Sequence, residues 1–235
     1  MPVKTQIGKT KYSSLPRRRE SSKIIPRGRV VGCKSTQNSH TIPVADGELT
    51  YWPEFLTESE ADRCFRYLHE KIVWHIPHIN LFGKEIQSPR MAAWYGDADA
   101  IYTYSGLTNQ PLPWFDDLSE LKQKVEQKTR HRFNSVLANL YRDGNDSMGW
   151  HSDDEAELGV QPVIASLSLG AERRFALRHK KRKALKPVEI ILKHGSLLLM
   201  SGKTQHYWRH CISKTRKPVT PRINLTFRLV KNANS

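Results

Sequence analysis

Hydrophobic and polar residues alternate most regularly between Arg222 and Arg228, near the end of the chain. In this segment and at the next residue, Leu229, every second side chain is apolar and the side chains between them are polar. Such alternation predicts a β-strand with one apolar and one polar face, because successive side chains of a strand point to opposite faces. Short runs bounded by turn residues predict further strands at residues 133–141, 162–169, 174–178, 188–192 and 196–200.

Two earlier segments have helical spacing. Thr57 and Glu60 form the sequence signature of a capping box, and apolar residues follow at positions 61, 64, 65, 68 and 72. Apolar residues at positions 114, 118, 121 and 125 predict a second helix. Two helices followed by many short strands favour an α+β fold whose core is a double-sheet jelly roll.

The charge of the chain adds a prediction about its partner. The 235 residues carry a formal net charge of +15 and a pI near 9.9, which indicates a polyanion such as nucleic acid. Residues 1–40 contain ten Lys or Arg and one acidic residue. They include few large apolar side chains, so burial cannot offset the entropy cost of ordering them, and we expect a disordered basic tail.

The sequence indicates neither a membrane span nor a secretion signal. No run approaches the roughly 18–20 apolar residues that cross a bilayer, and the first residues lack the apolar core of a signal peptide. Cys33, Cys64 and Cys211 are odd in number and widely spaced, so we expect reduced thiols rather than a disulfide framework. We therefore expect an intracellular protein, nuclear in a eukaryote or cytoplasmic in a bacterium. We also expect it to be a monomer.

His151 and Asp153 are the first candidate metal ligands. On an extended strand, residues two apart leave the same face about 7 Å from each other, close enough to hold one ion. With a second histidine they would form the 2-His-1-carboxylate set that is typical of non-haem Fe(II) oxygenases. A hydrogen-bonded loop pair is the alternative, because a His-x-Asp pair often arises by chance.

Four downstream histidines are candidates for the third ligand. His179 falls in the basic loop 178–186 and His194 precedes a turn glycine, so both are poor choices. His206 and His210 remain, and their spacing from the first pair does not distinguish them.

A 2-oxoacid cosubstrate would also need a cation that binds its far carboxylate in a bidentate manner, which favours Arg over Lys. Arg222 and Arg228 share the polar face of one predicted strand, and Asn139 and Tyr141 share a face of another. The alternative is that the polar face of residues 222–228 meets solvent, as happens in many antiparallel sheets.

Taken together, these residues resemble the AlkB family of Fe(II)/2-oxoglutarate-dependent nucleic-acid dealkylases over roughly residues 50–230. The match is closest to the homologues that repair alkylated duplex DNA. It implies a double-stranded β-helix core with flanking helices and a nucleotide-recognition lid. It also selects His210 as the third ligand, because the family places that histidine in an aromatic-x-His-x-aliphatic context, here residues 208–212. The segments that carry the resemblance are Phe133–Tyr141, Trp150–Glu155, Ile164–Gly170 and Pro221–Arg228.

The resemblance also implies roles for the other site residues. Asp154 would contact the exocyclic amine of the target base, and Tyr104 would stack that base against His151. An apolar tip at Phe82 would fill the gap left by a flipped base, as an inserted wedge does in other DNA-binding proteins. The residues expected to contact 2-oxoglutarate are Asn139, Tyr141, Arg222, Asn224, Thr226 and Arg228. The residues expected to contact substrate are Phe82, Gly83, Lys84, Tyr102, Thr103, Tyr104 and Asp154.

In this interpretation residues 41–110 hold the N-terminal helix and the lid hairpins, and residues 111–235 form the jelly-roll core of the same catalytic domain. The implied activity is DNA oxidative demethylation of N-alkylated bases such as 1-methyladenine and 3-methylcytosine. Fe(II), 2-oxoglutarate and O2 would be used, and formaldehyde, succinate and CO2 released. RNA demethylation and protein hydroxylation on the same scaffold are the alternatives. A non-enzymatic DNA-binding module is disfavoured by the complete set of metal and 2-oxoacid residues.

Overall fold

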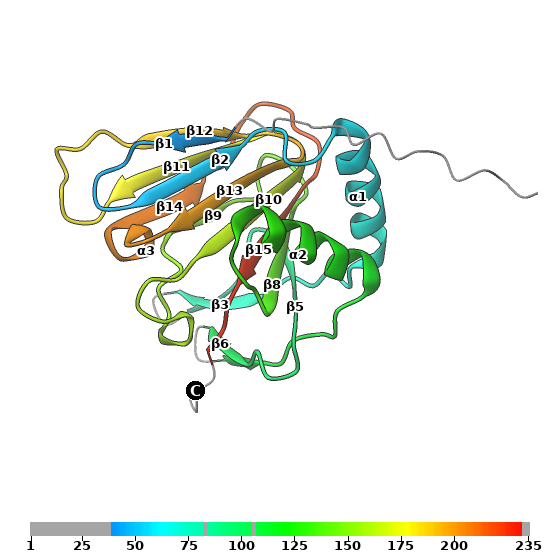
Figure 1. The fold of residues 1–235 in the computed structure, drawn as a ribbon. Helices are drawn as coiled ribbons and strands as arrows, with labels where there is room; N and C mark the ends of the chain where they lie inside the picture. Colours follow the sequence, from blue (N-terminus) through cyan, green and yellow to red (C-terminus); the bar gives the residue numbers. More distant parts are fainter. Residues whose placement is uncertain (1–38, 82–83, 105–106, 232–235) are drawn as a thin grey trace, which may run out of the picture. The chain divides into compact units, whose positions relative to one another are not determined.

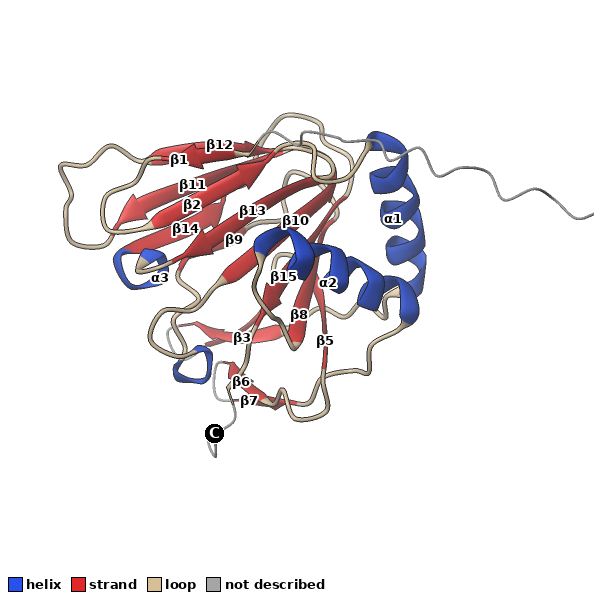
Figure 2. Cartoon of the chain, viewed as in Figure 1, coloured by secondary structure: helices blue, strands red, loops and turns tan. Residues whose placement is uncertain are grey.

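Two antiparallel sheets form the core of the protein (Figure 1). The computed structural model describes residues 39–81, 84–104 and 107–231. The larger sheet has seven strands in the order β1-β2-β13-β10-β15-β8-β5, and the smaller has four in the order β12-β11-β14-β9. Two separate hairpins, β3-β4 and β6-β7, complete the strands of the described chain (Figure 2). The double-sheet core agrees with the predicted jelly roll.

The strands of the larger sheet are β1 (His40–Ile42), β2 (Glu48–Trp52), β5 (Met91–Gly96), β8 (Ser135–Tyr141), β10 (Ile164–Gly170), β13 (Ser196–Ser201) and β15 (Arg222–Arg228). Those of the smaller sheet are β9 (Met148–His151), β11 (Arg173–His179), β12 (Val188–Leu192) and β14 (Trp208–Ile212). The hairpin strands are β3 (His78–Leu81), β4 (Lys84–Gln87), β6 (Tyr102–Tyr104) and β7 (Leu107–Asn109). The helices are α1 (Glu58–Lys71), α2 (Asp116–Thr129), the short α3 (Thr204–Tyr207) and a 3-10 turn at Ala156–Leu158.

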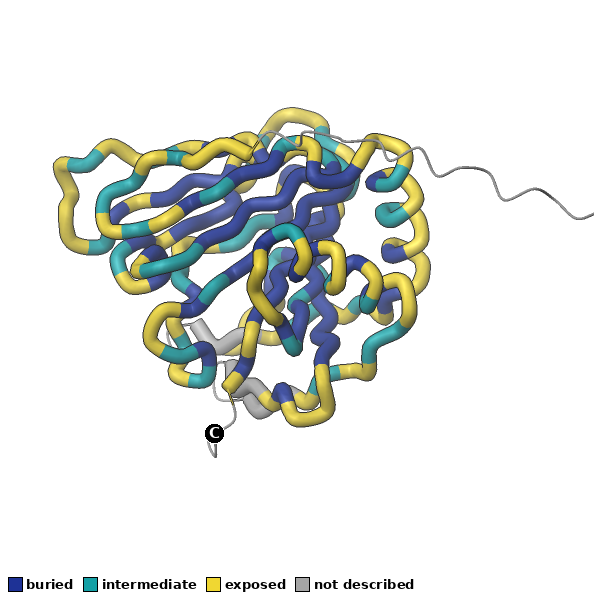
Figure 3. Tube along the Cα trace, in the orientation of Figure 1, coloured by how far each residue is buried: buried dark blue, intermediate teal, exposed yellow. Residues whose placement is uncertain are grey.

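The apolar side chains of the larger sheet divide between its two faces. One face packs against α1 and α2, where Leu68 and Leu118 meet Leu225 and other buried residues of the sheet. The other face packs against the smaller sheet, and Ile164 and Phe175 belong to that second buried cluster. Figure 3 shows the resulting pattern, with buried central strands and an exposed outer side on α1. Among the described residues, the core thus has two parts: one between the larger sheet and the helices, and one between the two sheets.

The predicted start of the first helix is confirmed by local geometry. Thr57 accepts a hydrogen bond from the backbone of Glu60, whose side chain accepts one from the Thr57 backbone, so both halves of the capping box are present. The second predicted helix corresponds to α2. None of the described helices is long and apolar enough to cross a membrane.

The sequence predicted two helices followed by many strands, and this order is wrong in one respect. Strands β1 and β2 precede α1 and pair at the edge of the larger sheet, where β2 lies next to β13. β5, at the opposite edge, pairs with β8. Residues before position 110 thus supply three strands of the core as well as the hairpins. The basic segment 1–38 lies outside the described residues.

Candidate active site

Residues from both sheets line one cavity. All seven residues of β15 are buried, so its polar face looks into this cavity and does not meet solvent. The solvent-facing alternative is therefore excluded. The polar residues that line the cavity include every expected metal ligand and every expected 2-oxoglutarate contact: Asn139, Tyr141, His151, Asp153, Arg222, Asn224, Thr226, Arg228 and His210, together with Ser166.

Three of these residues form a compact candidate metal centre. His151 and His210 are direct cross-strand partners on β9 and β14, so their side chains leave the same face of the smaller sheet. Asp153 follows two residues after His151, just beyond the end of β9. One possible ligand atom from each residue lies within 4.8 Å of the other two. The arrangement supplies two imidazoles and one carboxylate, the set that suits Fe(II).

The protonation states of these residues also suit a metal. The Nδ1 atom of His151 lies 2.9 Å from the carbonyl oxygen of Gly149; because a carbonyl only accepts, Nδ1 donates this hydrogen bond, and Nε2 is the ring nitrogen that is left for a metal. Burial, with the nearby His151, lowers the pKa of His210 to about 3, so this imidazole is neutral at physiological pH. Burial acts to raise the pKa of Asp153, but interactions led by the Arg228 guanidinium outweigh it and hold the pKa below its usual range.

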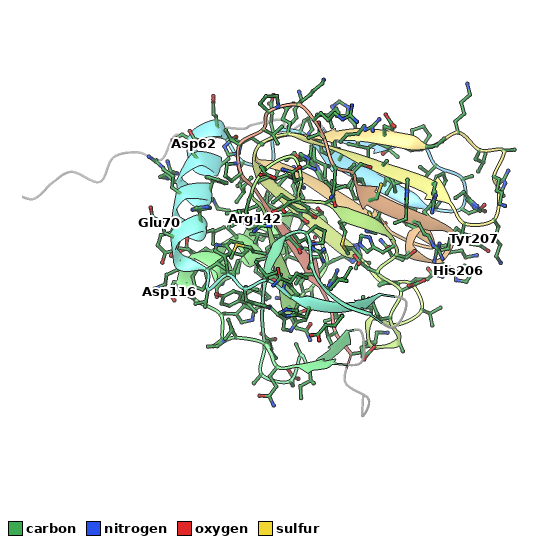
Figure 4. The ribbon with its side chains drawn as sticks, turned by 180° about the vertical axis from the view of Figure 1, so that it is seen from behind. Asp62, Glu70, Asp116, Arg142, His206 and Tyr207 are labelled. Carbon is green, nitrogen blue, oxygen red and sulfur yellow. The ribbon has the colours of Figure 1, made fainter. Side chains whose placement is uncertain are left out.

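The structure distinguishes the two histidines that spacing left open. His206 is exposed on α3, beside Tyr207, and Figure 4 shows both side chains at the edge of the domain. His210 is buried beside His151, with the two ring centroids 4.2 Å apart. The expectation that His179 falls in a loop is wrong, because it is the last residue of β11 and is buried. His179 nevertheless lies outside the cluster of three ligands.

Arg228 and Arg222 have different surroundings on the same strand face. Arg228 Nη2 donates a hydrogen bond to Asp153 Oδ1 at 2.9 Å, so this guanidinium is joined to a candidate metal ligand. Arg222 is fully buried and donates through Nη2 to Ser168 Oγ at 2.9 Å. Its Nε and Nη1 atoms are buried without a hydrogen-bond partner among the described residues. Because a buried unpaired donor is costly, this site suits an anion that accepts two hydrogen bonds.

Burial lowers the pKa of Arg222 to about 10, and the side chain remains a cation at neutral pH. Tyr141 is its direct cross-strand partner on β8, and the guanidinium carbon lies 5.2 Å from the centre of the Tyr141 ring. The open donors of Arg222 and the Tyr141 side chain therefore line the same end of the cavity.

The side-chain amide of Asn224 forms its hydrogen bonds within the protein. Its Nδ2 donates to Ser166 Oγ at 2.8 Å and to the Leu167 carbonyl at 3.1 Å. Its Oδ1 accepts from Thr226 Oγ1 at 3.0 Å. Asn224 thus supports the polar strand face through its contacts with Ser166, Leu167 and Thr226.

Arg90 is a site residue that the sequence did not indicate. It is buried, and its Nε donates to Asn139 Oδ1 at 2.8 Å while Nη1 donates to Ser88 Oγ at 3.0 Å. Because a guanidinium only donates, the Asn139 amide must turn its oxygen toward Arg90 and its NH2 group the other way. Arg90 is 49 positions from Asn139 in the chain and belongs to no recognisable pattern, so only the fold reveals the contact.

The expected substrate contacts are placed only in part. Phe82 and Gly83 lie outside the described residues. Lys84 begins β4, and residues 102–104 form β6, and the structure describes their backbone only. Asp154 is exposed and accepts a 2.7 Å hydrogen bond from Lys180 Nζ. Lys180 also donates to the Gln205 carbonyl at 2.8 Å, so it links the start of the basic loop both to α3 and to Asp154, the neighbour of Asp153.

The apolar wall of the cavity was also not predicted. These residues come from strands of both sheets, and their side chains exclude water from the polar centre. They are Leu137, Met148, Phe175, Leu192, Met200, Cys211 and Ile212.

Comparison with known proteins provides independent information on this site. Residues 48–228 match the family model of the 2OG-Fe(II) oxygenase superfamily. The chain is 40% identical over 219 residues to the alpha-ketoglutarate-dependent dioxygenase alkB homolog 3 of Bos taurus, covering 90% of this chain and 76% of the relative. It is 41% identical over 182 residues to the DNA oxidative demethylase ALKBH2 of Mus musculus, covering 74% of this chain and 76% of the relative. The solved structure of OsALKBH1 is similar in fold, with a TM-score of 0.60 at 17% identity, and covers 80% of this chain and 100% of that one.

Proposed function

The chain belongs to the 2OG-Fe(II) oxygenase superfamily, and we propose that within it this enzyme is a DNA oxidative demethylase that removes N-linked methyl groups from bases such as 1-methyladenine and 3-methylcytosine. The protein is a dioxygenase that uses Fe(II), 2-oxoglutarate and O2. The DNA substrate is supported by the ALKBH2 relatives, which are DNA oxidative demethylases, and by the net charge of +15.

One observation carries the assignment of the cosubstrate site. The two open donors of Arg222 lie in the same cavity as His151, Asp153 and His210. A dicarboxylate needs both features, because one end binds the metal and the other needs a cation. We assign the far carboxylate of 2-oxoglutarate to Arg222, with Tyr141 as a further donor. Asn139, oriented by Arg90, supplies an NH2 group to the cosubstrate.

When bound at the three ligands, iron supplies the oxidising chemistry: 2-oxoglutarate and O2 yield succinate and CO2, and one oxygen atom enters a C–H bond of the methyl group. The protein residues prepare that step. His151 presents Nε2, His210 is held neutral by burial, and Arg228 keeps Asp153 ionised and oriented. The apolar wall excludes water from the reacting groups. The hydroxymethyl product on nitrogen then loses formaldehyde and leaves the repaired base.

A methylated base nitrogen that belongs to the pairing edge is inaccessible in a duplex, so we propose that the base is flipped into the site. The segments that we expect to hold the flipped base and its strand belong to the hairpins β3-β4 and β6-β7. They are Phe82, Gly83 and Lys84, which follow β3 in the sequence, and Tyr102, Thr103 and Tyr104, which form β6. Asp154 would contact the exocyclic amine of the base, which requires that its ion pair with Lys180 yields to the substrate.

The proposed function is tested by formaldehyde release from methylated single-stranded DNA, double-stranded DNA and RNA, each with and without Fe(II) and 2-oxoglutarate. We expect release from DNA that requires both additions. Release from RNA alone would reassign the substrate, and turnover of 2-oxoglutarate without release from any nucleic acid would favour a protein substrate.

A further inference from the structure

Two arginines face each other on the outer surface of the smaller sheet. Arg178 on β11 and Arg209 on β14 are direct cross-strand partners, and both are exposed. Their strand neighbours Leu177 and His210 point into the core. Like charges directly opposite each other destabilise an antiparallel pair, so this arrangement has a cost in the protein alone.

Several other cations of the same strand and of the loop that follows it are neutralised by acidic side chains, but these two are not. Among the described residues neither Arg178 nor Arg209 forms an ion pair with an Asp or Glu side chain. By contrast, Arg174 pairs with Glu189 at 3.1 Å, Lys180 with Asp154 at 2.7 Å, and Arg182 with Asp46 at 3.2 Å. On the described strands of the smaller sheet, the exposed positive charge that lacks an acidic partner is therefore concentrated at Arg178 and Arg209.

An aromatic ring lies beside the two arginines. Trp150 on β9, the strand next to β14, is 37% exposed, and the Arg178 guanidinium carbon lies 4.2 Å from its ring centre. The cation–π contact holds both flat groups in place at the surface. Trp150 directly precedes His151, so its ring lies on the face of the sheet opposite the candidate metal centre.

We propose that Trp150, Arg178 and Arg209 form a binding surface for a nucleic-acid strand that flanks the reacting base. This inference rests on the proposed function, because it assigns the strand to the DNA substrate. Guanidinium groups bind phosphate through paired hydrogen bonds, and an exposed indole stacks on an unpaired base. A strand bound here lies outside the smaller sheet, across it from the metal, so the surface positions the nucleic acid and takes no part in the chemistry.

The positive charge of Arg178 and Arg209 favours a nucleic-acid strand as the ligand of this surface. A polyanion neutralises both facing guanidiniums and removes the repulsion that the free protein retains. An acidic peptide would satisfy the charges but not the exposed ring, whereas a nucleic acid offers phosphates and bases at regular intervals.

The test measures binding of an unmodified, fluorescently labelled single-stranded oligonucleotide to the enzyme with Fe(II) and 2-oxoglutarate under anaerobic conditions. Arg178→Ala and Arg209→Ala should each weaken binding and each reduce the dependence of log K on log salt by about 0.7, the value for one phosphate contact on a single strand. Trp150→Ala should weaken binding about fivefold or more without changing that slope, because stacking is not electrostatic. Trp150→Tyr should retain most of the affinity, which distinguishes loss of the ring from damage to the fold.

Arg174→Ala is the matched control, since Arg174 lies on the same strand and the same face but is already paired with Glu189. It should bind like the unaltered enzyme. Equal weakening by Arg174→Ala and Arg178→Ala would overturn the proposal, as would unchanged binding by both Arg178→Ala and Arg209→Ala. Equally strong competition by a polyglutamate peptide would reassign the surface to an acidic protein.

Failure of this inference can be distinguished from failure of the proposed function. If the unaltered enzyme binds the oligonucleotide through these residues but releases no formaldehyde from methylated DNA, the binding surface is supported and the proposed activity is refuted. If formaldehyde is released while the Arg178 and Arg209 variants bind the oligonucleotide normally, the proposed activity is supported and the binding surface is refuted.

Discussion

Arg222 and Arg228 are six positions apart on one strand face, but their surroundings give them different roles. Arg228 donates to Asp153, so its charge acts on a metal ligand. Arg222 keeps Nε and Nη1 buried and open toward the cavity. The sequence grouped both as anchors for 2-oxoglutarate because alternation shows only that they share a face. Arg228 reaches Asp153 because of the path of the chain after β9, which alternation does not describe.

Arg222→Lys should raise the KM for 2-oxoglutarate by about tenfold or more, because lysine cannot form the paired hydrogen bonds of a guanidinium. Arg228→Lys should change the KM less and instead raise the Fe(II) concentration needed for half-maximal activity. Steady-state kinetics with each component varied separately measure both effects. If Arg228→Lys has the larger effect on the KM for 2-oxoglutarate, the two roles are reversed.

Arg90 is a positioning residue in this arrangement, since it acts on the cosubstrate through Asn139. Arg90→Met keeps the apolar part of the side chain but loses the hydrogen bond to Asn139 Oδ1. We expect a higher KM for 2-oxoglutarate with little change in the Fe(II) requirement, because the three metal ligands are not contacted. A double variant with Asn139→Ala should be no worse than Asn139→Ala alone. Additive losses would show that Arg90 acts independently of Asn139.

His210→Ala should abolish formaldehyde release and 2-oxoglutarate turnover, because it removes one of three protein ligands. His206→Ala should retain most activity, since that side chain is exposed on α3. Fe(II) binding measured directly, by equilibrium dialysis, should follow the same order. An inactive His206 variant beside an active His210 variant would contradict the ligand assignment.

At the scale of elements, the sequence located strands well but not what covers them. The segment predicted at 188–192 is β12 without change, and alternation correctly divided β15 into two faces. A polar strand face has the same sequence pattern whether it meets water or a second sheet. The burial of Arg222 and Asn224 therefore could not be predicted from the sequence and is seen only in the fold. The pairing of His151 with His210 is likewise a matter of register between strands that are far apart in the chain.

The hairpin β3-β4 supports a prediction about duplex DNA. Its two strands pair from His78 opposite Gln87 to Leu81 opposite Lys84, and Phe82 lies between them in the sequence. Flipping a base costs a few kcal/mol in a duplex and much less in a single strand. An apolar wedge offsets that cost only where a stack exists. Phe82→Ala should therefore slow repair of a methylated duplex by roughly tenfold or more, with little effect on the same lesion in a single strand.

Tyr104→Ala is the control for the hairpin variant, because a wall of the base pocket should matter for both substrates. Repair rates of matched single- and double-stranded oligonucleotides measure the comparison. Equal loss on both substrates for Phe82→Ala would make the residue structural, and would favour single-stranded DNA or RNA as the substrate.

At the scale of the whole molecule, most of the net positive charge belongs to a segment that is far in sequence from the residues that line the cavity. Residues 1–38 contain ten Lys or Arg and one acid, a net of +9 out of +15, so the described domain and the last four residues carry the remaining +6. The protein residues that line the cavity all lie between positions 137 and 228. The basic segment should therefore influence how often DNA meets the enzyme, and not the reaction after binding.

Replacing Arg17, Arg18 and Arg19 with Gln tests this separation, because it removes three charges far in sequence from the cavity. For a methylated duplex we expect a higher KM at low salt, an unchanged kcat, and a difference that disappears as salt is raised. If each arginine meets a phosphate, the slope of log affinity against log salt should fall by up to about 2.7, since each duplex contact contributes about 0.9. The matched Arg→Lys triple variant keeps the charge and should behave like the unaltered enzyme. A Lys variant as weak as the Gln variant would instead indicate contacts that require guanidinium groups, and a lower kcat in either would show that the segment takes part in steps after binding.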